Sequence, residues 1–138
     1  MRALALAWLG LLVAIPGATQ SLPRLETGAP ALQQTWVDPV GGDDRASGRA
    51  RDSAVRTVAE AWNRVPRSAA GAPFSGQGYE IMLAAGEYPA DGLPTYWAQR
   101  YGSLEAPVVV RAADGPGTAV LRGGLNIAHV AYLYLIDV

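Results

Sequence analysis

The sequence contains no cysteine and no lysine, and it has only one histidine. Without cysteine the chain has no disulfide bond, no thiolate ligand for a metal and no cysteine for a lipid anchor, so burial and backbone pairing must hold the fold together. Because lysine is absent, the eleven Lys or Arg positions are all arginines. A catalytic lysine base therefore cannot come from these 138 residues.

The chain also lacks an excess of charge of either sign. Eleven basic residues are balanced by twelve acidic residues, which gives a formal net charge of −1. Nucleic-acid binding requires a clustered surplus of basic side chains to neutralise phosphates, so this class of function is disfavoured. Four arginines do lie close together, but three aspartates among them indicate a solvated face of mixed charge. This stretch contains Arg45, Arg49, Arg51 and Arg56 with Asp43, Asp44 and Asp52.

The longest uncharged hydrophobic run lies at the N-terminus. Arg2 precedes uncharged residues 3–15, and the small or turn-forming residues 16–18 follow. These are the three parts of a secretory signal peptide, with cleavage expected near Ala18. A membrane span is the alternative, but the run is shorter than the ~20 residues that a bilayer requires. We therefore expect residues 1–18 to direct export to the cell envelope, the periplasm or the medium, and no membrane span to remain after their removal.

The next segments combine irregular chain, one strand and a turn. Residues 19–34 carry prolines and no sustained hydrophobic period, so we interpret them as a flexible lead-in. "TWVDP" predicts a short strand anchored by Trp36. The glycines and aspartates of "VGGDDRASG" then predict a turn, because these residues tolerate tight or left-handed backbone conformations.

One segment predicts a helix, "DSAVRTVAEAWNRVP", from about Asp52 to Val65. Asp52 or Ser53 can accept hydrogen bonds from the free amides at its start, and Pro66 marks its end. Apolar residues recur at helical spacing along one face. They are Val55, Val58, Ala59, Trp62 and Val65. A helix with one apolar face covers another part of the molecule.

After this helix the hydrophobic period changes to short, nearly all-apolar runs with Gly, Asp and Pro at their corners, which predict strands. The runs centre on Ile81, Val109, Val120, Ile127 and Tyr134. A single helix excludes repeated βαβ units. Ile81, Val109 and Tyr134 recur at comparable spacing, as equivalent positions in the coils of a solenoid would.

The order of these pieces resembles the start of secreted right-handed parallel β-helix proteins, the pectate-lyase-like superfamily. The resemblance covers residues 35–138 and depends on "WVDPVGGDDRASG", the amphipathic helix, "GYEIMLAAGEY" and "GSLEAPVVVRAADGPGTAVLRGG". A strand that ends in Gly-x-Tyr is matched by residues 86–88, and a strand led by proline is matched by residues 107–111. The resemblance implies an all-β solenoid with one N-terminal capping α-helix.

The strongest strand signal lies at the C-terminus, in residues 132–138. An apolar strand needs a neighbour for its backbone groups, and a solenoid needs a cap at both ends. The predicted helix supplies a cap at the N-terminal end only. We therefore expect an incomplete β-helix in which further coils, or a partner chain, cover the edge from Tyr132 to Val138. A complete small domain that buries this edge in a dimer is the alternative.

The resemblance also implies a function, namely binding or cleavage of an extracellular acidic polysaccharide. Enzymes of the superfamily are polysaccharide lyases, which use an unusually basic Lys or Arg and commonly Ca²⁺, or glycoside hydrolases, which use two carboxylates. Such groups usually project from middle coils, so we expect no catalytic centre and no evident cofactor in these residues, with Ca²⁺ possible in a longer protein. A non-catalytic adhesive solenoid, or a small self-associating binding module, is the alternative.

The segment "PTYWAQRYG" is the candidate substrate-binding site, with Tyr96, Trp97, Arg100 and Tyr101. We interpret it as a loop between strands. Its aromatic rings can pack against sugar rings, or they can pack the loop onto the coil, and we favour packing because large aromatic side chains dominate core burial.

Other polar residues have a structural interpretation. Asp43 and Asp44 follow two glycines, an arrangement that is more typical of a turn than of a Ca²⁺ site. His129 has no neighbouring serine or carboxylate pattern, so we place it in a turn or at the surface.

Aspartates and arginines also follow the predicted strands. Asp114 and Asp137 stand where side chains commonly cap corners. Arg111 and Arg122 are candidates to line a groove that attracts acidic sugars. These residues do not form a catalytic constellation.

Overall fold

The computed structural model describes residues 29–138, and the expected signal peptide and most of the expected lead-in lie outside this part of the chain. The described part is mostly β-strand with one α-helix, which confirms the all-β class. The elements are β1 (Leu32–Val37), η1 (Arg51–Ser53), α1 (Val58–Arg64), β2 (Gly78–Leu83), β3 (Gly86–Pro89), η2 (Ala90–Gly92), β4 (Trp97–Tyr101), β5 (Val108–Ala112), β6 (Ala119–Arg122), β7 (Ile127–Ala131) and β8 (Leu133–Ile136). Among these helices none has the length and hydropathy to cross a membrane.

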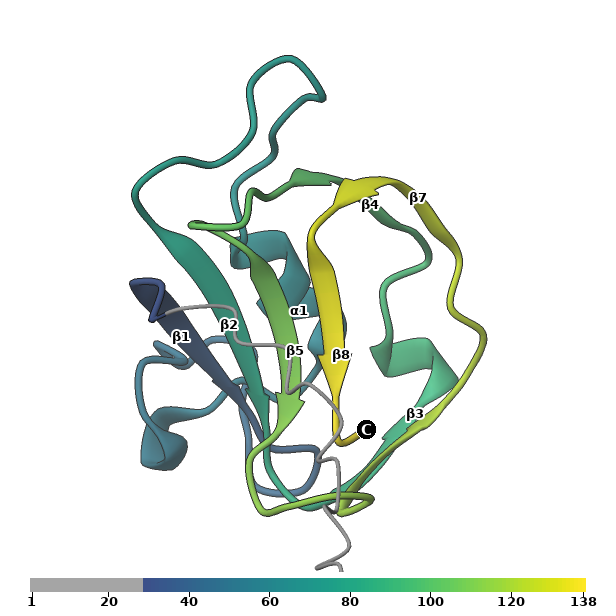
Figure 1. Cartoon of the computed structure of the whole chain (residues 1–138). Coiled ribbons are helices and arrows are strands. Elements are labelled where there is room, and N and C mark those ends of the chain that lie inside the picture. The colour runs from purple at the N-terminus through teal and green to yellow at the C-terminus, as the bar shows by residue number, and fades with distance from the viewer. Residues whose placement is uncertain (1–28) are drawn as a thin grey trace, which may run out of the picture.

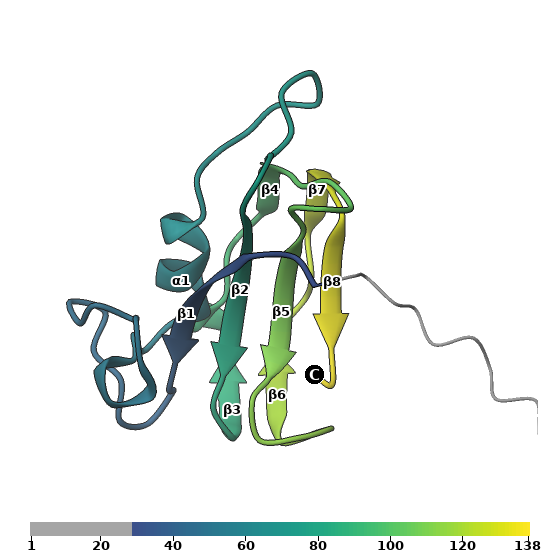
Figure 2. The same cartoon turned by 60° about the vertical axis from the view of Figure 1, so that its left-hand side comes forward.

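All the ladders between these strands are parallel, and they form three sheets. The largest sheet has the order β1-β2-β5-β8, while β3 pairs with β6 and β4 pairs with β7. Along the chain, β2, β3 and β4 enter the three sheets in turn, and β5, β6 and β7 repeat this order beside them (Figure 1 and Figure 2). Each strand therefore pairs with its counterpart from the next pass of the chain.

The C-terminal strand signal corresponds to β8, which pairs with β5 along one side. Within residues 29–138 no strand pairs with the other side of β8. Tyr132, which precedes β8, and Leu135 within it are both exposed.

The pairing of β2, β5 and β8 corrects the expected equivalence of three positions. Val109 pairs with Tyr134 as expected, but Ile81 pairs with Val110, and Glu80 is the partner of Val109. A shift of one residue exchanges the two faces of a strand. Ile81 and Val110 accordingly belong to the core, whereas Glu80 and Val109 share the opposite face of the sheet.

The core lies between the three sheets, and α1 covers it beside β1 and β2 (Figure 2). Val58, Ala61 and Trp62 of α1 are buried. The ring of Trp62 meets the fully buried ring of Trp97 edge-to-face, with the ring centroids 5.0 Å apart. Such a contact contributes about 0.5–1.5 kcal/mol beyond the burial of its area. The helix is thus anchored to the interior side of β4.

The helix is shorter than the expected range 52–65, and its N-cap is a different residue. It begins after Thr57, whose hydroxyl accepts a hydrogen bond from the backbone N–H of Glu60 at 3.1 Å. The expected caps, Asp52 and Ser53, lie instead in the separate turn η1.

Pairing with β1 explains the late start of the helix. Val55 lies opposite Val37 in a parallel bridge, and its N–H donates to the carbonyl of Trp36 at 2.9 Å. Val55 is fully buried. Its apolar side chain therefore matched the spacing of a buried helical face in the sequence, although its backbone is extended. The predicted end is confirmed, because Val65 is the C-cap and Pro66 follows it.

The expected lead-in is also too long. β1 begins at Leu32, so residues 32–34 belong to a strand. Its register against β2 brings Gln34 beside Glu80, and the Gln34 side chain donates a hydrogen bond to the Glu80 carboxylate at 2.9 Å.

Candidate functional site

The segment predicted to be a loop contains β4, so this prediction is wrong. β4 pairs with β7, but the ladder has no pair between Gln99 and His129. These two neighbouring residues have positive φ angles of 58° and 53°. A left-handed residue in the middle of a strand breaks the alternation of side chains, and the sequence pattern therefore did not indicate a strand.

The predicted binding residues separate into buried and exposed members. Trp97 is fully buried and Arg100 is 5 % exposed, whereas Tyr96 is 65 % exposed and Tyr101 is partly exposed. The packing role therefore applies to Trp97. The other three side chains line two hollows on the face of β4.

The first hollow, called the Arg67 hollow, has a volume of about 190 Å³. It is lined by Trp62, Asn63, Arg67, Tyr96, Ala98, Gln99 and Arg100. The second, called the Tyr101 hollow, has a volume of about 270 Å³. It is lined by Ser68, Ala69, Ala70, Gln99, Tyr101 and His129. The two hollows meet at Gln99, and neither is lined by a carboxylate from residues 29–138.

Hydrogen bonds hold the chain after α1 against β4 and fix the boundary between the hollows. The guanidinium of Arg67 donates to the side-chain oxygen of Gln99 at 2.9 Å. The N–H of Ser68 donates to the carbonyl of Gln99 at 2.9 Å, and the N–H of Tyr101 donates to the Ser68 hydroxyl at 2.6 Å. The site is therefore built from two segments that are distant in sequence.

Arg100 is a buried cation that has no anionic partner among residues 29–138. Its Nη1 donates to the carbonyl of Ala98 at 2.9 Å and its Nη2 to the carbonyl of Trp62 at 3.1 Å, with the guanidinium 5.1 Å from the centre of the Trp62 ring. Its Nε has no hydrogen-bond partner in the part of the chain that the structure describes. Burial, with a further contribution from the charge of Arg67, lowers the pKa of Arg100.

Neither Arg67 nor Arg100 forms an ion pair with a carboxylate of residues 29–138. A buried charge is costly unless an opposite charge compensates it. The Arg67 hollow is therefore lined by two guanidinium groups whose charge no carboxylate of the described residues pairs with.

Arg111 and Arg122, the two candidates for a groove, are instead paired with carboxylates. Arg111 Nε lies 2.9 Å from a carboxylate oxygen of Glu80, and Arg122 forms an ion pair with Glu87. Each charge is thus matched by an opposite charge on a neighbouring strand.

The two aspartates of the predicted turn hold the nearby backbone in place by accepting hydrogen bonds from its N–H groups. Asp43 accepts a hydrogen bond from the N–H of Arg45 at 2.9 Å, and Asp44 accepts from the N–H groups of Arg56 and Thr57 at 2.8 Å each. In residues 29–138 no group of three His, Cys, Asp or Glu side chains is arranged to hold a metal ion.

Asp114 has the corner-capping role that its position predicted. Its carboxylate accepts a hydrogen bond from the N–H of Ala85 at 2.8 Å and pairs with both terminal nitrogens of Arg51 at 2.7 Å. The hydrogen bonds from Arg51 hold the pKa of Asp114 below its ordinary value. Asp137 follows β8 with a positive φ of 61°, and its carbonyl accepts a hydrogen bond from Gly117. His129 is exposed, as expected.

Sequence reasoning missed Arg67, Ser68 and Gln99. Arg67 and Ser68 follow the helix in a segment rich in small residues, and nothing in that pattern indicates which strand the segment contacts. Their contribution arises from the tertiary pairing of this segment with β4.

Comparison of the chain with family models, curated proteins and solved structures found no match. Function is therefore inferred from the geometry and charge of the two hollows.

Proposed function

We propose that the chain is an exported right-handed parallel β-helix of the pectate-lyase-like type, and that its β4 face binds an acidic polysaccharide. Three parallel sheets that the chain enters twice in the same order support the solenoid. The position of α1 beside the first strands supports its role as a cap.

The observation that carries the binding proposal is the pair of arginines without carboxylate partners. Arg67 and Arg100 line one hollow, and no acidic side chain of the described chain lines it. The carboxylates of an acidic sugar would supply the missing negative charge, and hydrogen bonds to charged groups are the stronger ones.

The aromatic side chains favour a sugar as the carrier of that charge. Tyr96 is largely exposed beside Arg67, and Tyr101 lies in the adjoining hollow. Aromatic rings offer a large apolar surface for the apolar face of a sugar ring. Because the hollows meet at Gln99, consecutive units of one polysaccharide chain can occupy them.

Binding, and not hydrolysis, is the function that this face supports best. Glycoside hydrolysis uses a pair of carboxylates on the two sides of the scissile bond. The hollows offer arginine, tyrosine and amide groups from the described residues, and no such pair. A surface or adhesive solenoid thus fits the β4 face better than a hydrolase does.

Calorimetric titration with polygalacturonate, and with dextran as the uncharged comparison, tests this proposal. Arg67→Gln should weaken polygalacturonate binding by about 10-fold or more, because it removes a charge-assisted hydrogen bond of roughly 1.5–3 kcal/mol. Tyr96→Ala should weaken it by about 2- to 10-fold, from the loss of roughly 0.5–1.5 kcal/mol of ring contact.

Leu104→Ala is the matched control, because Leu104 is 52 % exposed and lines neither hollow. It should bind polygalacturonate as the unmodified chain does. Dextran binding of equal strength, or polygalacturonate binding that neither variant weakens, would contradict the proposal.

A further inference from the structure

His129 is the only histidine of the chain, and it lies on the wall of the Tyr101 hollow. Histidine is the side chain whose charge ordinarily changes between about pH 8 and about pH 5. Carboxyl groups ordinarily titrate below about pH 5, and tyrosine and arginine titrate well above about pH 8. The chain has no cysteine and no lysine. Among the side chains that line the two hollows, His129 is therefore the one whose charge changes in this range.

The ladder between β4 and β7 places His129 beside Gln99. The two strands pair on both sides of these residues, and both residues have left-handed backbone conformations, with φ angles of 53° and 58°. Gln99 lines both hollows, and His129 lines the Tyr101 hollow next to it. His129 thus stands close to the boundary at which the hollows meet.

The elements that pack against His129 are β4 and residues 66–70, and neither contains an acidic side chain. β4 contributes Arg100 and Tyr101, and residues 66–70 contribute Arg67, which donates a hydrogen bond to Gln99. His129 is exposed and forms no ion pair with a carboxylate of residues 29–138. A proton that His129 gains therefore adds a positive charge that the described chain leaves unpaired.

The two hollows differ in charge. The Arg67 hollow is lined by two arginines, whereas the Tyr101 hollow is lined by none. Arginine keeps its charge throughout the range from about pH 5 to about pH 8, so the Arg67 hollow does not change. The Tyr101 hollow gains its first charged side chain from the described residues when His129 is protonated. A carboxylate in that hollow thus meets a cation in the lining only at the lower pH.

We propose that protonated His129 binds the carboxylate of the sugar unit that occupies the Tyr101 hollow, so that the β4 face holds acidic polysaccharide more tightly as the pH falls. This inference rests on the proposed function, which places consecutive units of one polysaccharide chain in the two hollows. Both ring nitrogens of a protonated imidazole are donors, and their hydrogen bonds to a carboxylate are charge-assisted. Because the bound carboxylate stabilises the protonated ring, binding takes up protons near the pH at which histidine titrates.

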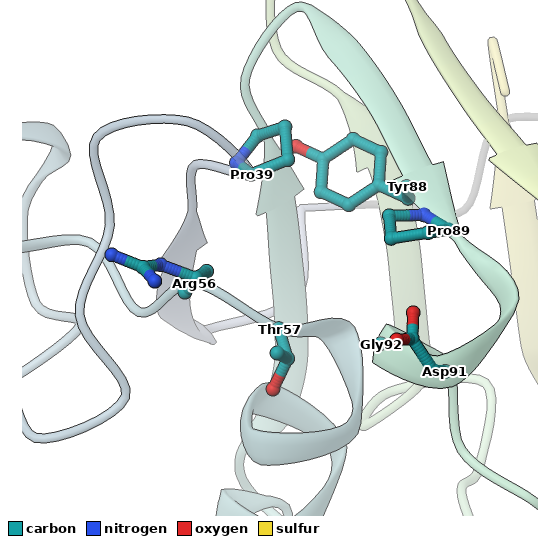
Figure 3. Close-up of a pocket in the computed structure, with 7 residues that line it drawn as sticks. All are labelled: Pro39, Arg56, Thr57, Tyr88, Pro89, Asp91 and Gly92. Atoms are coloured by element: carbon teal, nitrogen blue, oxygen red, sulfur yellow. The ribbon is translucent and has the colours of Figure 1, made fainter.

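A further pocket, around Pro39, does not share this response. It has a volume of about 220 Å³, and two of its lining residues, Arg56 and Asp91, carry opposite charges (Figure 3). Arginine and aspartate side chains ordinarily keep their charges between about pH 5 and about pH 8, and His129 does not line this pocket. A gain of affinity at low pH that depends on His129 therefore distinguishes the β4 face from the Pro39 pocket.

The test is a calorimetric titration of the full chain with polygalacturonate at one ionic strength. The affinity should be about 2- to 5-fold higher at about pH 5 than at about pH 8, which is the strength of an exposed ion pair. At about pH 6.5 the heat of binding should depend on the ionisation enthalpy of the buffer, as net uptake of protons requires.

His129→Asn should abolish the difference in affinity between the two pH values. Asparagine is chosen because it adopts the left-handed conformation more readily than most residues. His129→Lys is the second variant, in case His129→Asn alters the fold. Its charge is present at both pH values, so it should bind polygalacturonate more tightly than His129→Asn at about pH 8. Leu104→Ala, which lines neither hollow, should keep the pH dependence of the unmodified chain.

The outcomes separate this inference from the proposed function. Equal affinity of the unmodified chain at both pH values would overturn the role of His129 and leave polygalacturonate binding intact. A pH dependence that His129→Asn retains would also overturn it, and would point to the α-amino group, which titrates in the same range. Absence of binding at both pH values would overturn the proposed function together with this inference.

Discussion

At the scale of single residues, Asp44 fixes the entrance to α1. Its carboxylate accepts hydrogen bonds from the N–H groups of Arg56 and Thr57 and from the Thr57 hydroxyl. Burial alone would raise the pKa of Asp44, but these hydrogen bonds outweigh burial and hold the pKa below 3.8. A carboxyl group with a depressed pKa stabilises the fold above its unfolded-state pKa, and this contribution is lost as pH falls through the folded-state pKa.

Asp44→Asn should therefore lower the free energy of unfolding by about 1–2 kcal/mol near pH 7, because charge-assisted hydrogen bonds are lost. The difference from the unmodified chain should begin to shrink below about pH 4, where this carboxyl becomes protonated in the unfolded chain, and should be lost as the pH falls through the lower folded-state pKa of Asp44. Urea unfolding at about pH 7 and about pH 3 measures both values. Asp43→Asn is the control, because within residues 29–138 the Asp43 carboxylate accepts a single hydrogen bond, from the N–H of Arg45. An equal loss of stability at both pH values would contradict this account.

The candidate site was partly predictable at this scale. Tyr96, Arg100 and Tyr101 stand in one recognisable segment, and all three line a hollow. Arg67 and His129 carried no such signal, because their place beside this segment depends on pairing between distant parts of the chain.

At the scale of elements, the turn between β1 and η1 contains two adjacent glycines, Gly41 and Gly42. Only at Gly42 does the surrounding backbone exclude every other residue type. A Cβ atom at Gly42 would overlap the carbonyl oxygens of Val55 and Asp38. At Gly41 the nearest atom is a side-chain oxygen of Asp38 at 3.1 Å, which can move. The two glycines look alike in sequence but differ in what surrounds them.

Gly42→Ala should therefore destabilise the protein by about 2 kcal/mol or more, the size associated with backbone overlap in a packed turn. Gly41→Ala should lower the free energy of unfolding by a clearly smaller amount. Thermal unfolding of the two variants compares them directly, and equal midpoints would show that the turn is not packed against residues 54–56 as described.

Most strands were predictable from their apolar runs, since Ile81, Val109, Val120, Ile127 and Tyr134 all lie in strands. There are two exceptions. Residues 86–88 were expected to end the strand around Ile81, but they lie in the separate strand β3 of another sheet. In β4 the left-handed conformation of Gln99 interrupts the alternation. The start of α1 was misplaced for a related reason, because burial at Val55 imitated helical periodicity. Hydrophobic patterns report burial, and burial does not by itself distinguish an extended residue from a helical one.

At the scale of the whole molecule, the net charge is −1, so the protein as a whole does not attract a polyanion. Under the proposed function, attraction would come from the local charges of Arg67 and Arg100. Polygalacturonate binding should weaken as salt rises from about 50 to about 500 mM, because salt screens exposed charges. Arg67→Gln should show a shallower dependence. Binding that does not change with salt would contradict an electrostatic origin.

The arrangement in three parallel sheets was not derivable from hydrophobic patterns alone. Short apolar runs predict strands but leave their partners open, and the register of β2 against β5 differed by one residue from the spacing argument. The parallel arrangement was expected only from the likeness to parallel β-helix proteins that we inferred from the order of the segments.

The most direct test of acidic-polysaccharide binding is an NMR titration of the full chain with a short galacturonate oligomer. The amide signals of Arg67, Ser68, Gln99, Tyr101 and His129 should shift together, because these residues line the two hollows on β4. Shifts confined to the outer face of the β1-β2-β5-β8 sheet, or no shifts at these five residues, would contradict the proposed role of the β4 face.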